Sequence, residues 1–519
     1  MSPYIGNLSF LRFINLENNS LFGEIPQSVG HLFRLQNPSV SLLSPLNLSH
    51  NMLEGNIPVN LSYCSKLKIL RLGTNKLTGM IPSELGSLGK LLVLIVDKNN
   101  LTGGIPPSLG NISSLGMLDV AYNNLAGNVP DDLGARLKSL TFLSFVSNNL
   151  SGTIPLSLYN ISSMSIFAIS RNHFKDTLPP SIGLTFPNVR MFEIGANEFF
   201  GMVPESFSNA SRLQLLDISS NYFFGVISAS LGNLPDLKIL ALQGNTLGNS
   251  SSNSLDFIES LTNCSQMELL DLSYNKFGGF LPQSIGNLST RFSQLYFGGN
   301  EIYGNIPTTL KDLANLIVLT MYDNLFTGVI PASLGKLQNL QLSYLHENNL
   351  SGKIPSSIGN LTRLYAFSLG PNRLEGSIPA SIANCQNLQK LWIMETSLSG
   401  TISKEVLGIP SYLVIDFSGN SLTGSLPVEV GKLKNINTLD LSGNNLTSEI
   451  PETIGDCQSL EYLYLRGNFF QGTLPSSLSS LRGLRRLDIS RNKLHGEIPK
   501  GLQKLRFLQY LNISYNDLE

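Results

Sequence analysis

The chain has 519 residues, of which 14 % are charged and 42 % hydrophobic, and its formal net charge at pH 7 is −1. An average globular protein carries about 25 % charged residues. This chain therefore has too much apolar content to be disordered, and it lacks the basic excess of a nucleic-acid-binding protein. Its surplus is in Asn, with 51 residues against 35 Lys and Arg combined.

A repeat accounts for this surplus. The motif L-x-L-x-x-N-x-L-x-G-x-(I/L/V)-P recurs along the whole chain, most often with a step of 24 residues. Leu alternates with period 2 before each Asn, which predicts a short strand with one buried face. We call this residue the ladder Asn; it stands at positions 19, 51, 75, 99, 123, 148, 172, 197, 221, 245, 275, 300, 324, 348, 372, 420, 444, 468, 492 and 516, and Thr396 takes its place once.

Twenty Asn and one Thr make 21 turns. The Asn amide is suited to satisfying backbone groups at the bend that follows the strand. Because a single unit cannot bury its apolar face, the turns are expected to stack into one solenoid over residues 1–519.

The repeat carries a family resemblance. LGTNKLTGMIPSELGSLGKL (72–91) and LSGNNLTSEIPETIGDCQSL (441–460) resemble the plant-specific leucine-rich repeat. The resemblance implies an α/β-type solenoid: a right-handed superhelix of about 21 turns, with a parallel β-sheet on its concave side and short helical or 3-10 segments on its convex side.

Two steps between ladder residues are longer than the rest. The first step has 32 residues, with a surplus at about 37–44 that is either a loop or an error in the gene model. The second has 30 residues, NTLGNSSSNSLDFIESLTNCSQMELLDLSYN (245–275), and carries an insertion at 246–264. This insertion is similar to one in the plant receptor-like kinases that include rice Xa21-type resistance receptors and the bacterial elongation-factor receptor. That group has a signal peptide, a membrane helix and a Ser/Thr kinase. We expect this chain, without them, to be an ectodomain truncated at both ends.

The chain contains no apolar run long enough for a membrane helix, which needs about 20 residues. The four cysteines, Cys64, Cys264, Cys385 and Cys457, stand at equivalent positions in different turns. The closest pair is three turns apart, roughly 14 Å at ~4.8 Å per strand, so no disulfide is expected. No catalytic motif is recognisable and the five His are scattered. We therefore predict no enzyme activity, no cofactor and no metal site.

N-x-S/T sequons are frequent, which is typical of a protein that passes through the secretory pathway. The glycosylation candidates are Asn7, Asn18, Asn47, Asn60, Asn100, Asn111, Asn149, Asn160, Asn209, Asn249, Asn263, Asn287, Asn349, Asn360, Asn445 and Asn512. The expected location of the parent protein is the extracellular side of the plasma membrane.

Strand residues at six, four, two and one positions before the ladder residue should face outward on the concave sheet. In most turns these positions hold small residues or Asp, but between about 290 and 400 they become aromatic and acidic. Interface hot spots favour Trp and Tyr, so a ligand site is predicted at Tyr296, Tyr322, Asp323, Tyr344, His346, Glu347, Trp392, Met394 and Glu395. The turn of Asn372, with Ala366, Ser368 and Gly370, is expected to interrupt this patch, and Tyr462, Tyr464 and Arg466 form a weaker second cluster.

The favoured interpretation is the ligand-recognition ectodomain of a plant cell-surface receptor of the defence type. It would bind a peptide or protein ligand, with a co-receptor ectodomain as a further partner, and would signal through a kinase outside this chain. One alternative is a secreted inhibitor or decoy, similar to the polygalacturonase-inhibiting leucine-rich proteins, although those are shorter. The other is a gene fragment without function.

Overall fold

The computed structural model describes residues 1–35, 46–250 and 254–519. The predicted surplus at 37–44 lies outside these residues. Two compact units are present: the first comprises Met1–Gly248 with Asn263–Met267, and the second comprises Asn249–Thr262 with Glu268–Glu519. The division falls in the longer repeat at 246–264, and the single solenoid over 1–519 stays a prediction.

Each turn contributes one short strand to a parallel sheet. In the first unit, the described strands of this sheet are β1 (Ile14–Asn15), β3 (Leu46–Asn47), β5 (Ile69–Arg71), β7 (Val93–Ile95), β8 (Met117–Asp119), β10 (Phe142–Ser144), β12 (Ile166–Ala168), β14 (Met191–Glu193), β16 (Leu215–Asp217) and β18 (Ile239–Ala241). In the second unit they are β20 (Leu269–Asp271), β22 (Gln294–Tyr296), β24 (Val318–Thr320), β26 (Leu342–Tyr344), β28 (Ala366–Ser368), β30 (Lys390–Trp392), β32 (Val414–Asp416), β34 (Thr438–Asp440), β36 (Tyr462–Tyr464), β38 (Arg486–Asp488) and β40 (Tyr510–Asn512). Among the described residues this makes 21 strands, the number of turns that the ladder residues predict.

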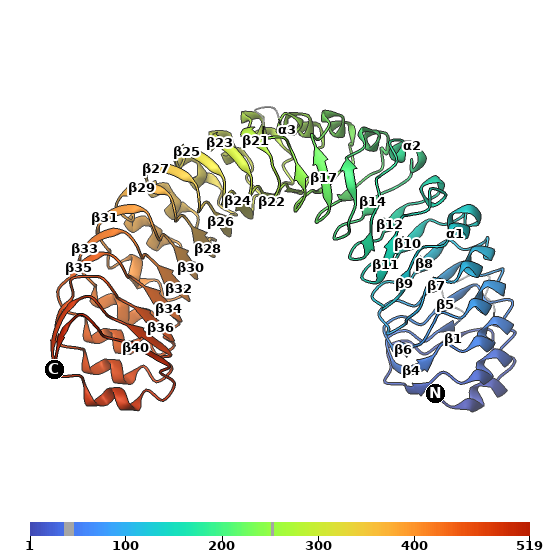
Figure 1. The fold of residues 1–519 in the computed structure, drawn as a ribbon, viewed down its shortest axis with the longest axis horizontal. Helices are drawn as coiled ribbons and strands as arrows, with labels where there is room; N and C mark the ends of the chain where they lie inside the picture. The colour runs from blue at the N-terminus through green and yellow to red at the C-terminus, as the bar shows by residue number, and fades with distance from the viewer. Residues whose placement is uncertain (36–45, 251–253) are drawn as a thin grey trace. The chain divides into compact units, whose positions relative to one another are not determined.

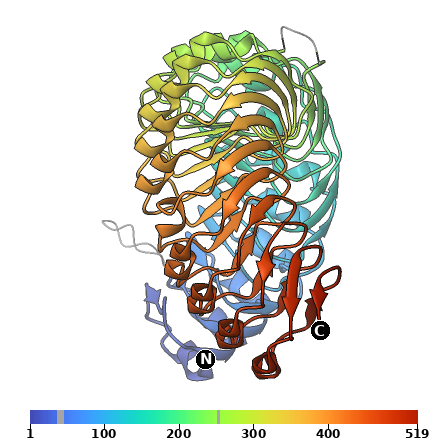
Figure 2. The same ribbon diagram turned by 90° about the vertical axis from the view of Figure 1, so that its left-hand side faces the viewer.

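Successive strands keep one register. In the second unit Tyr296 pairs with Thr320, which pairs with Tyr344, and the same column continues through Ser368 to Trp392. Residues at equivalent repeat positions therefore form straight columns across the sheet. Within each unit these strands line the inner, concave side (Figure 1), and Figure 2 shows the orange and red strands of the second unit stacked side by side.

The chain leaves each strand at the ladder residue, and in all described turns except that of Asn99 it then forms a second, lateral strand. In the second unit the lateral strands are β21 (Gly278–Phe280), β23 (Glu301–Asn305), β25 (Leu325–Val329), β27 (Asn349–Lys353), β29 (Arg373–Gly376), β31 (Ser397–Thr401), β33 (Ser421–Ser425) and β35 (Asn445–Thr447), followed by β37 (Gln471–Gly472), β39 (Lys493–Gly496) and β41 (Asp517–Leu518). The lateral strands of the first unit form three-stranded sheets: β2 (Phe22–Glu24), β4 (Met52–Asn56) and β6 (Lys76–Thr78); β9 (Ala126–Gly127), β11 (Asn149–Gly152) and β13 (His173–Phe174); and β15 (Phe200–Met202), β17 (Tyr222–Gly225) and β19 (Thr246–Leu247).

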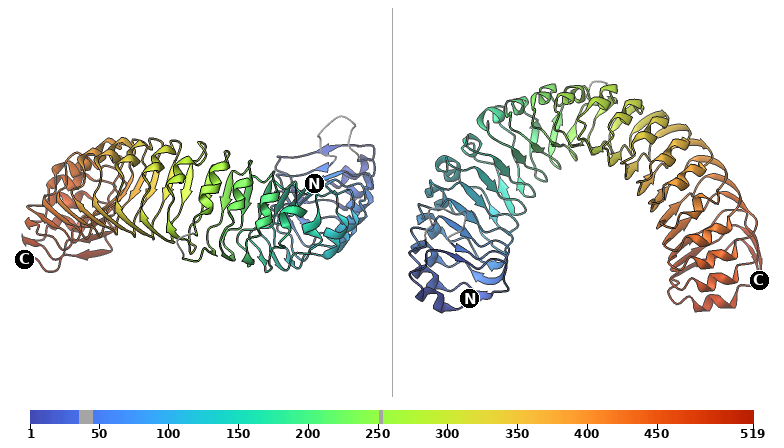
Figure 3. Two further views of the ribbon diagram at one scale, coloured as in Figure 1. Left: turned by 90° about the horizontal axis from the view of Figure 1, so that it is seen from above. Right: turned by 180° about the vertical axis from the view of Figure 1, so that it is seen from behind.

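The convex side consists of short 3-10 helices such as η12 (Ala332–Lys336) and η16 (Val428–Lys432), together with the α-helices α1 (Asp131–Arg136), α2 (Ile182–Thr185) and α3 (Phe257–Ser260). The Pro of the repeat stands at the N-cap of η12 and η16, where its missing N–H costs nothing, whereas Asp256 stands at the N-cap of α3. The helical turns are visible on the outer side of each unit in Figure 3. No helix in the described part of the chain is long and apolar enough to cross a membrane.

The core of each unit is the stack of inward-facing apolar side chains. Leu439, Leu441 and Leu446 in one turn are fully buried, as are their equivalents in neighbouring turns. Each fully buried Leu contributes roughly 1.5–3 kcal/mol, and the contribution is shared with the adjacent turns. The predicted class of fold, with its parallel sheet and short 3-10 segments, is confirmed.

Candidate ligand-binding face

The ladder Asn side chains hold the sheet in place beneath the concave surface. The Asn324 Nδ2 donates to the carbonyl oxygens of Met321 and Tyr322 in its own turn, and at 2.9 Å to that of Phe297 in the preceding turn. Its Oδ1 accepts the N–H of Ile302 at 3.0 Å. One buried amide thus satisfies four backbone groups at the bend and connects two turns, the role that the sequence predicts.

The aspartates four positions before the ladder Asn also act on the backbone. Asp440 accepts the Ser442 N–H at 2.9 Å, and Asp416 accepts the Ser418 N–H at 3.0 Å. Burial raises the pKa of Asp440, and the nearby Asp416 carboxylate raises it further. These positions are therefore occupied by structural hydrogen bonds, as expected for the turns without aromatic residues.

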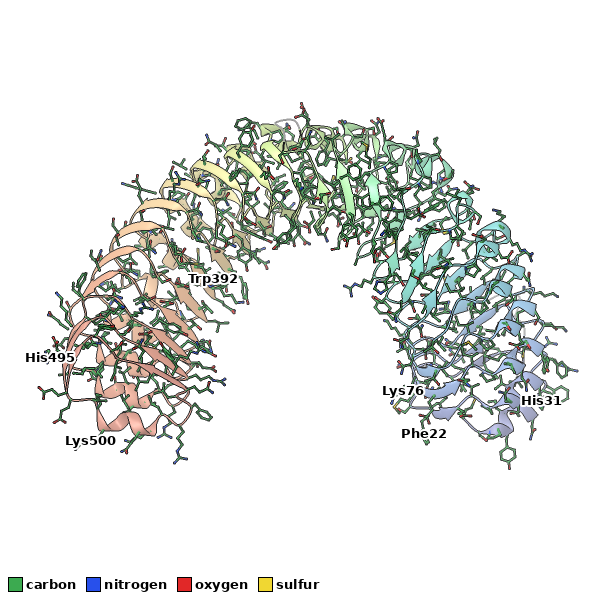
Figure 4. The ribbon with its side chains drawn as sticks, viewed as in Figure 1. Phe22, His31, Lys76, Trp392, His495 and Lys500 are labelled. Atoms are coloured by element: carbon green, nitrogen blue, oxygen red, sulfur yellow. The ribbon has the colours of Figure 1, made fainter. Side chains whose placement is uncertain are left out.

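Five aromatic rings on the concave sheet form a continuous chain of contacts in the second unit. We call Tyr274, Tyr322, His346, Tyr344 and Trp392 the aromatic band. The Tyr322 hydroxyl donates to that of Tyr274 at 2.9 Å, and Tyr322 stacks on His346 with ring centroids 4.9 Å apart. Tyr344 contacts His346 edge-on at 5.7 Å and Trp392 at 6.2 Å. Figure 4 shows Trp392 on the inner side of the sheet.

Two glycines make room for the first part of the band. A Cβ at Gly298 would lie 2.5 Å from the Tyr322 ring, and one at Gly299 would lie 2.6 Å from the Tyr274 ring. The two Tyr rings therefore pack directly over bare backbone. Tyr274 was missed by the sequence reasoning because it stands outside the interval in which the residue types change; the Gly-Gly pair of the following turn is the signal that could have pointed to it.

The turn of Asn372 does not separate the band into two patches. Ser368 lies between Tyr344 and Trp392 in the register, yet those two rings contact each other. Ser368 is only 4 % exposed and Ala366 is fully buried. The expectation of an interruption is thus corrected: small side chains leave space in which the flanking rings can meet.

The other predicted residues lie around the band. Tyr296 is half-buried and its hydroxyl donates to the Gln294 Oε1 at 2.8 Å. Met394 is half-buried in the same column as Tyr322 and His346. Asp323, Glu347 and Glu395 are exposed, each directly before a ladder residue. Lys390, which the sequence reasoning did not name, lies over the Trp392 ring at 5.9 Å.

Burial changes the protonation of the band. Desolvation lowers the pKa of His346, and the Glu347 and Asp323 carboxylates partly offset this effect. The His346 Nδ1 is buried and has no hydrogen-bond partner in the described part of the chain. Desolvation also raises the pKa of Tyr322 and of Tyr344. These shifts favour the neutral forms of His346, Tyr322 and Tyr344, and the exposed Asp323, Glu347 and Glu395 border them.

Further along the same face lies a groove of about 440 Å³, lined by Glu395, Ser418, Gly419, Ser442, Gly443, Arg466, Gly467 and Arg491. Its glycines occupy the position before the ladder Asn with positive φ, 63° at Gly419 and 62° at Gly443. The floor is consequently bare backbone. Of the second predicted cluster, the exposed Arg466 lines this groove, whereas Tyr462 and Tyr464 are half-buried and are not among its lining residues.

Of the sixteen sequon Asn residues, twelve are exposed and three, Asn60, Asn349 and Asn512, are half-buried. Asn47 is 5 % exposed and its Nδ2 donates to the Glu17 carboxylate at 2.8 Å, so we do not retain it as a candidate. Seven of the exposed ones end convex-side 3-10 helices: Asn7, Asn111, Asn160, Asn209, Asn263, Asn287 and Asn360.

The cysteines and carboxylates suggest no further chemistry. All four cysteines are buried free thiols, and the Cys457 Sγ lies 3.2 Å from the Val430 carbonyl oxygen of the preceding turn. Burial raises the pKa of Cys457 to about 12, which keeps the thiol protonated and unreactive. The described residues contain no group of three or more His, Cys, Asp or Glu arranged to hold a metal ion.

Comparisons with known proteins agree with this geometry. The protein-family model for the leucine-rich repeat region matches residues 411–519. The family model for the single leucine-rich repeat matches residues 10–32, 66–88, 212–234 and 266–288. The receptor-like Ser/Thr protein kinase EFR of Arabidopsis thaliana is 46 % identical over 88 residues, which is 17 % of this chain and 8 % of that protein. The receptor kinase-like protein Xa21 of Oryza sativa subsp. japonica is 44 % identical over 88 residues, with the same shares. These alignments span only a small part of either relative.

Solved structures cover much more. The Arabidopsis receptor kinase HAESA, in complex with the peptide hormone IDA and the co-receptor SERK1, is 33 % identical with a TM-score of 0.88; the match covers 100 % of this chain and 84 % of that one. The ectodomain of GASSHO1/SCHENGEN3 from Arabidopsis thaliana, in complex with CASPARIAN STRIP INTEGRITY FACTOR 2, is 32 % identical with a TM-score of 0.78, covering 100 % and 72 %. This chain belongs to the leucine-rich-repeat ectodomains of plant receptor kinases.

Proposed function

We propose that this chain is the ligand-recognition ectodomain of a plant cell-surface receptor, and that the aromatic band binds a peptide or protein ligand. The observation that carries the proposal is the continuity of the band: five rings contact one another on a face where most turns present Asp, Ser or Gly. Large aromatic side chains on an open sheet face favour association with a partner.

Two further observations support the concave face as the binding side. Between positions 268 and 500, the sequons stand only at Asn287, Asn349, Asn360 and Asn445, on convex helices or lateral strands. Glycans attached there would leave the band open. HAESA was crystallised with the peptide hormone IDA, and GASSHO1/SCHENGEN3 with CASPARIAN STRIP INTEGRITY FACTOR 2. We therefore favour a peptide as the class of ligand.

The defence type and the co-receptor are parts of the same proposal. The defence assignment rests on the insertion at 246–264 and on the local identity to EFR and Xa21. A co-receptor ectodomain is proposed because the HAESA complex contains one. We accordingly propose that the parent protein lies at the cell surface and passes its signal to a kinase.

The test is the double variant Tyr344→Ala with Trp392→Ala. Peptides selected from a random display library on the wild-type chain are expected to bind this variant at least about thirtyfold more weakly, because hot-spot aromatics contribute roughly 2 kcal/mol or more. The matched control is Phe280→Ala with Tyr303→Ala. These two rings lie on lateral strands of the same unit, with their centroids 4.6 Å apart. Unchanged affinity in the first variant, or an equal loss in both, would refute binding on the band.

A further inference from the structure

Three carboxylates border the aromatic band. Asp323, Glu347 and Glu395 each stand directly before a ladder residue, are exposed, and share a left-handed backbone with φ of 50°, 54° and 49°. The Asp323 N–H donates to the His346 carbonyl oxygen at 3.1 Å, which fixes this residue beside the band. The three therefore form an acidic column parallel to the column of Tyr322, His346 and Met394.

The carboxylates and the rings share one surface. Against the larger effect of desolvation, the Glu347 and Asp323 carboxylates raise the pKa of His346, and Asp323 adds to the desolvation that raises the pKa of Tyr322. The ion pairs found in the described chain involve other residues. Lys390 is a cation on the band itself, and it lies over Trp392. The acidic column is thus not neutralised by any of these pairs.

We propose that the aromatic band and its acidic column recognise Arg or Lys side chains of an extended peptide; this inference rests on the proposed function and specifies the ligand of that site. A guanidinium or ammonium group gains about 0.5–2 kcal/mol on an aromatic face, and a charge-assisted hydrogen bond to a carboxylate adds to it. Lys390 over the Trp392 ring is an example, within the chain itself, of a cation on an aromatic face. An acidic peptide segment would be repelled at the same place.

The spacing limits the arrangement of the basic residues. Neighbouring strands lie ~4.8 Å apart, so Glu347 and Glu395, two turns apart, are separated by roughly 10 Å along the sheet. An extended peptide rises ~3.3 Å per residue, so basic side chains about three residues apart would match them. The preference should end beyond Glu395, because the groove that follows carries Arg466 and Arg491.

The experiment is a selection of random peptides about twelve residues long, enough to span roughly eight turns, on the intact chain. Arg and Lys are expected to be enriched at least about threefold over the unselected library. The variant Asp323→Lys with Glu347→Lys should abolish this enrichment. Lys is compatible with the backbone there, since Lys98 holds the equivalent position with φ of 50°. The control is Glu301→Lys with Glu375→Lys, two exposed carboxylates on lateral strands with the same change in charge.

Enrichment in the wild type that persists in the control and disappears in Asp323→Lys/Glu347→Lys supports the inference. Absence of basic enrichment in the wild type, or enrichment that survives the reversal at Asp323 and Glu347, overturns it. The proposed function is tested separately with the same peptides on Tyr344→Ala/Trp392→Ala. If the selected peptides show no preference for Arg or Lys but still bind Tyr344→Ala/Trp392→Ala more weakly, the proposed function is supported and only this inference is wrong.

Discussion

A single amide per turn determines how neighbouring turns are held together. The Asn444 Nδ2 donates to Phe417, Leu441 and Ser442, and its Oδ1 accepts from Leu422 at 3.0 Å. Because the bonds to Leu422, Phe417 and Leu441 are buried, losing the amide would leave backbone groups of two turns unsatisfied, so the side chain stabilises the structure beyond its own turn. The 20 ladder Asn and the 16 sequons account for 36 of the 51 Asn, since no residue serves as both.

Thr396 is the exception to this pattern and gives a stability prediction. Its hydroxyl donates to the Asn420 Oδ1, but it lacks the amide that, as in Asn444, donates three hydrogen bonds in most other turns. We expect Thr396→Asn to raise the free energy of unfolding by about 1 kcal/mol. The matched change, Asn444→Thr, should lower it by about 2–4 kcal/mol because it leaves buried carbonyl groups unsatisfied. Urea unfolding followed by circular dichroism measures both, and a destabilised Thr396→Asn would contradict the role assigned to the amide.

Asp119 gives a prediction of pH dependence. Burial raises its pKa to about 6, and the Asp97 carboxylate adds to this shift. A carboxyl group whose pKa is higher in the folded state binds protons more tightly there, so its ionisation costs stability above pH 6, and this cost is relieved as the pH falls towards 4. Asp119→Asn should therefore be more stable than the wild type by about 1–2 kcal/mol at pH 7.5, after allowance for partial exposure, and equally stable at pH 4. Urea titrations at both pH values provide the measurement; a difference independent of pH would exclude this cause.

At the scale of strands and turns, the sequence predicts the fold better than the site. Period-2 Leu positions and the Asn column specify each strand, because their burial is local to a turn and its neighbours. The contacts of the aromatic band are different. Tyr274 and Tyr322 are 48 residues apart in the sequence. Whether Tyr344 contacts Trp392 depends on the side-chain conformations that the two rings adopt above Ser368. Such contacts depend on side-chain rotamers and on glycine gaps, which residue type and spacing do not specify.

Gly298 tests whether the band acts as one element. A Cβ at this position would meet the Tyr322 ring at 2.5 Å, so Gly298→Ala should displace the ring and break both its hydroxyl contact with Tyr274 and its stacking on His346. We expect selected peptides to bind about tenfold more weakly, a change of roughly 1.4 kcal/mol, measured by calorimetry. Gly408→Ala is the control, since a Cβ there meets nothing within 4 Å. If both variants bound equally well, the band would not depend on the position of Tyr322.

At the scale of the whole molecule, the composition follows from the stacking of turns. In the described turns of each unit the inward positions hold mainly Leu, Ile, Val and Phe, and the low share of charge, 14 %, is consistent with apolar residues being needed in every turn. Length alone suggests several separate domains, whereas contacts divide the described chain into two units. Since backbone pairing joins each turn only to its neighbours, and the ring contacts of the aromatic band reach no further than two turns, a binding face can occupy one stretch while the remaining turns vary independently.

The same modularity permits a test with a single added glycan. Thr396 lies two positions after Met394, so Met394→Asn creates the sequon N-E-T over positions 394–396, at a half-buried site of the concave face next to Trp392. We expect the variant, secreted from a glycosylating host and confirmed by mass spectrometry to carry the glycan, to lose binding of selected peptides by at least about thirtyfold, because a bulky glycan would cover the band. Met394→Gln removes the same side chain without creating a sequon and should retain binding within about threefold. Since the natural sequons of this stretch lie on convex or lateral positions, full binding by the glycosylated variant would place the ligand on one of those surfaces instead.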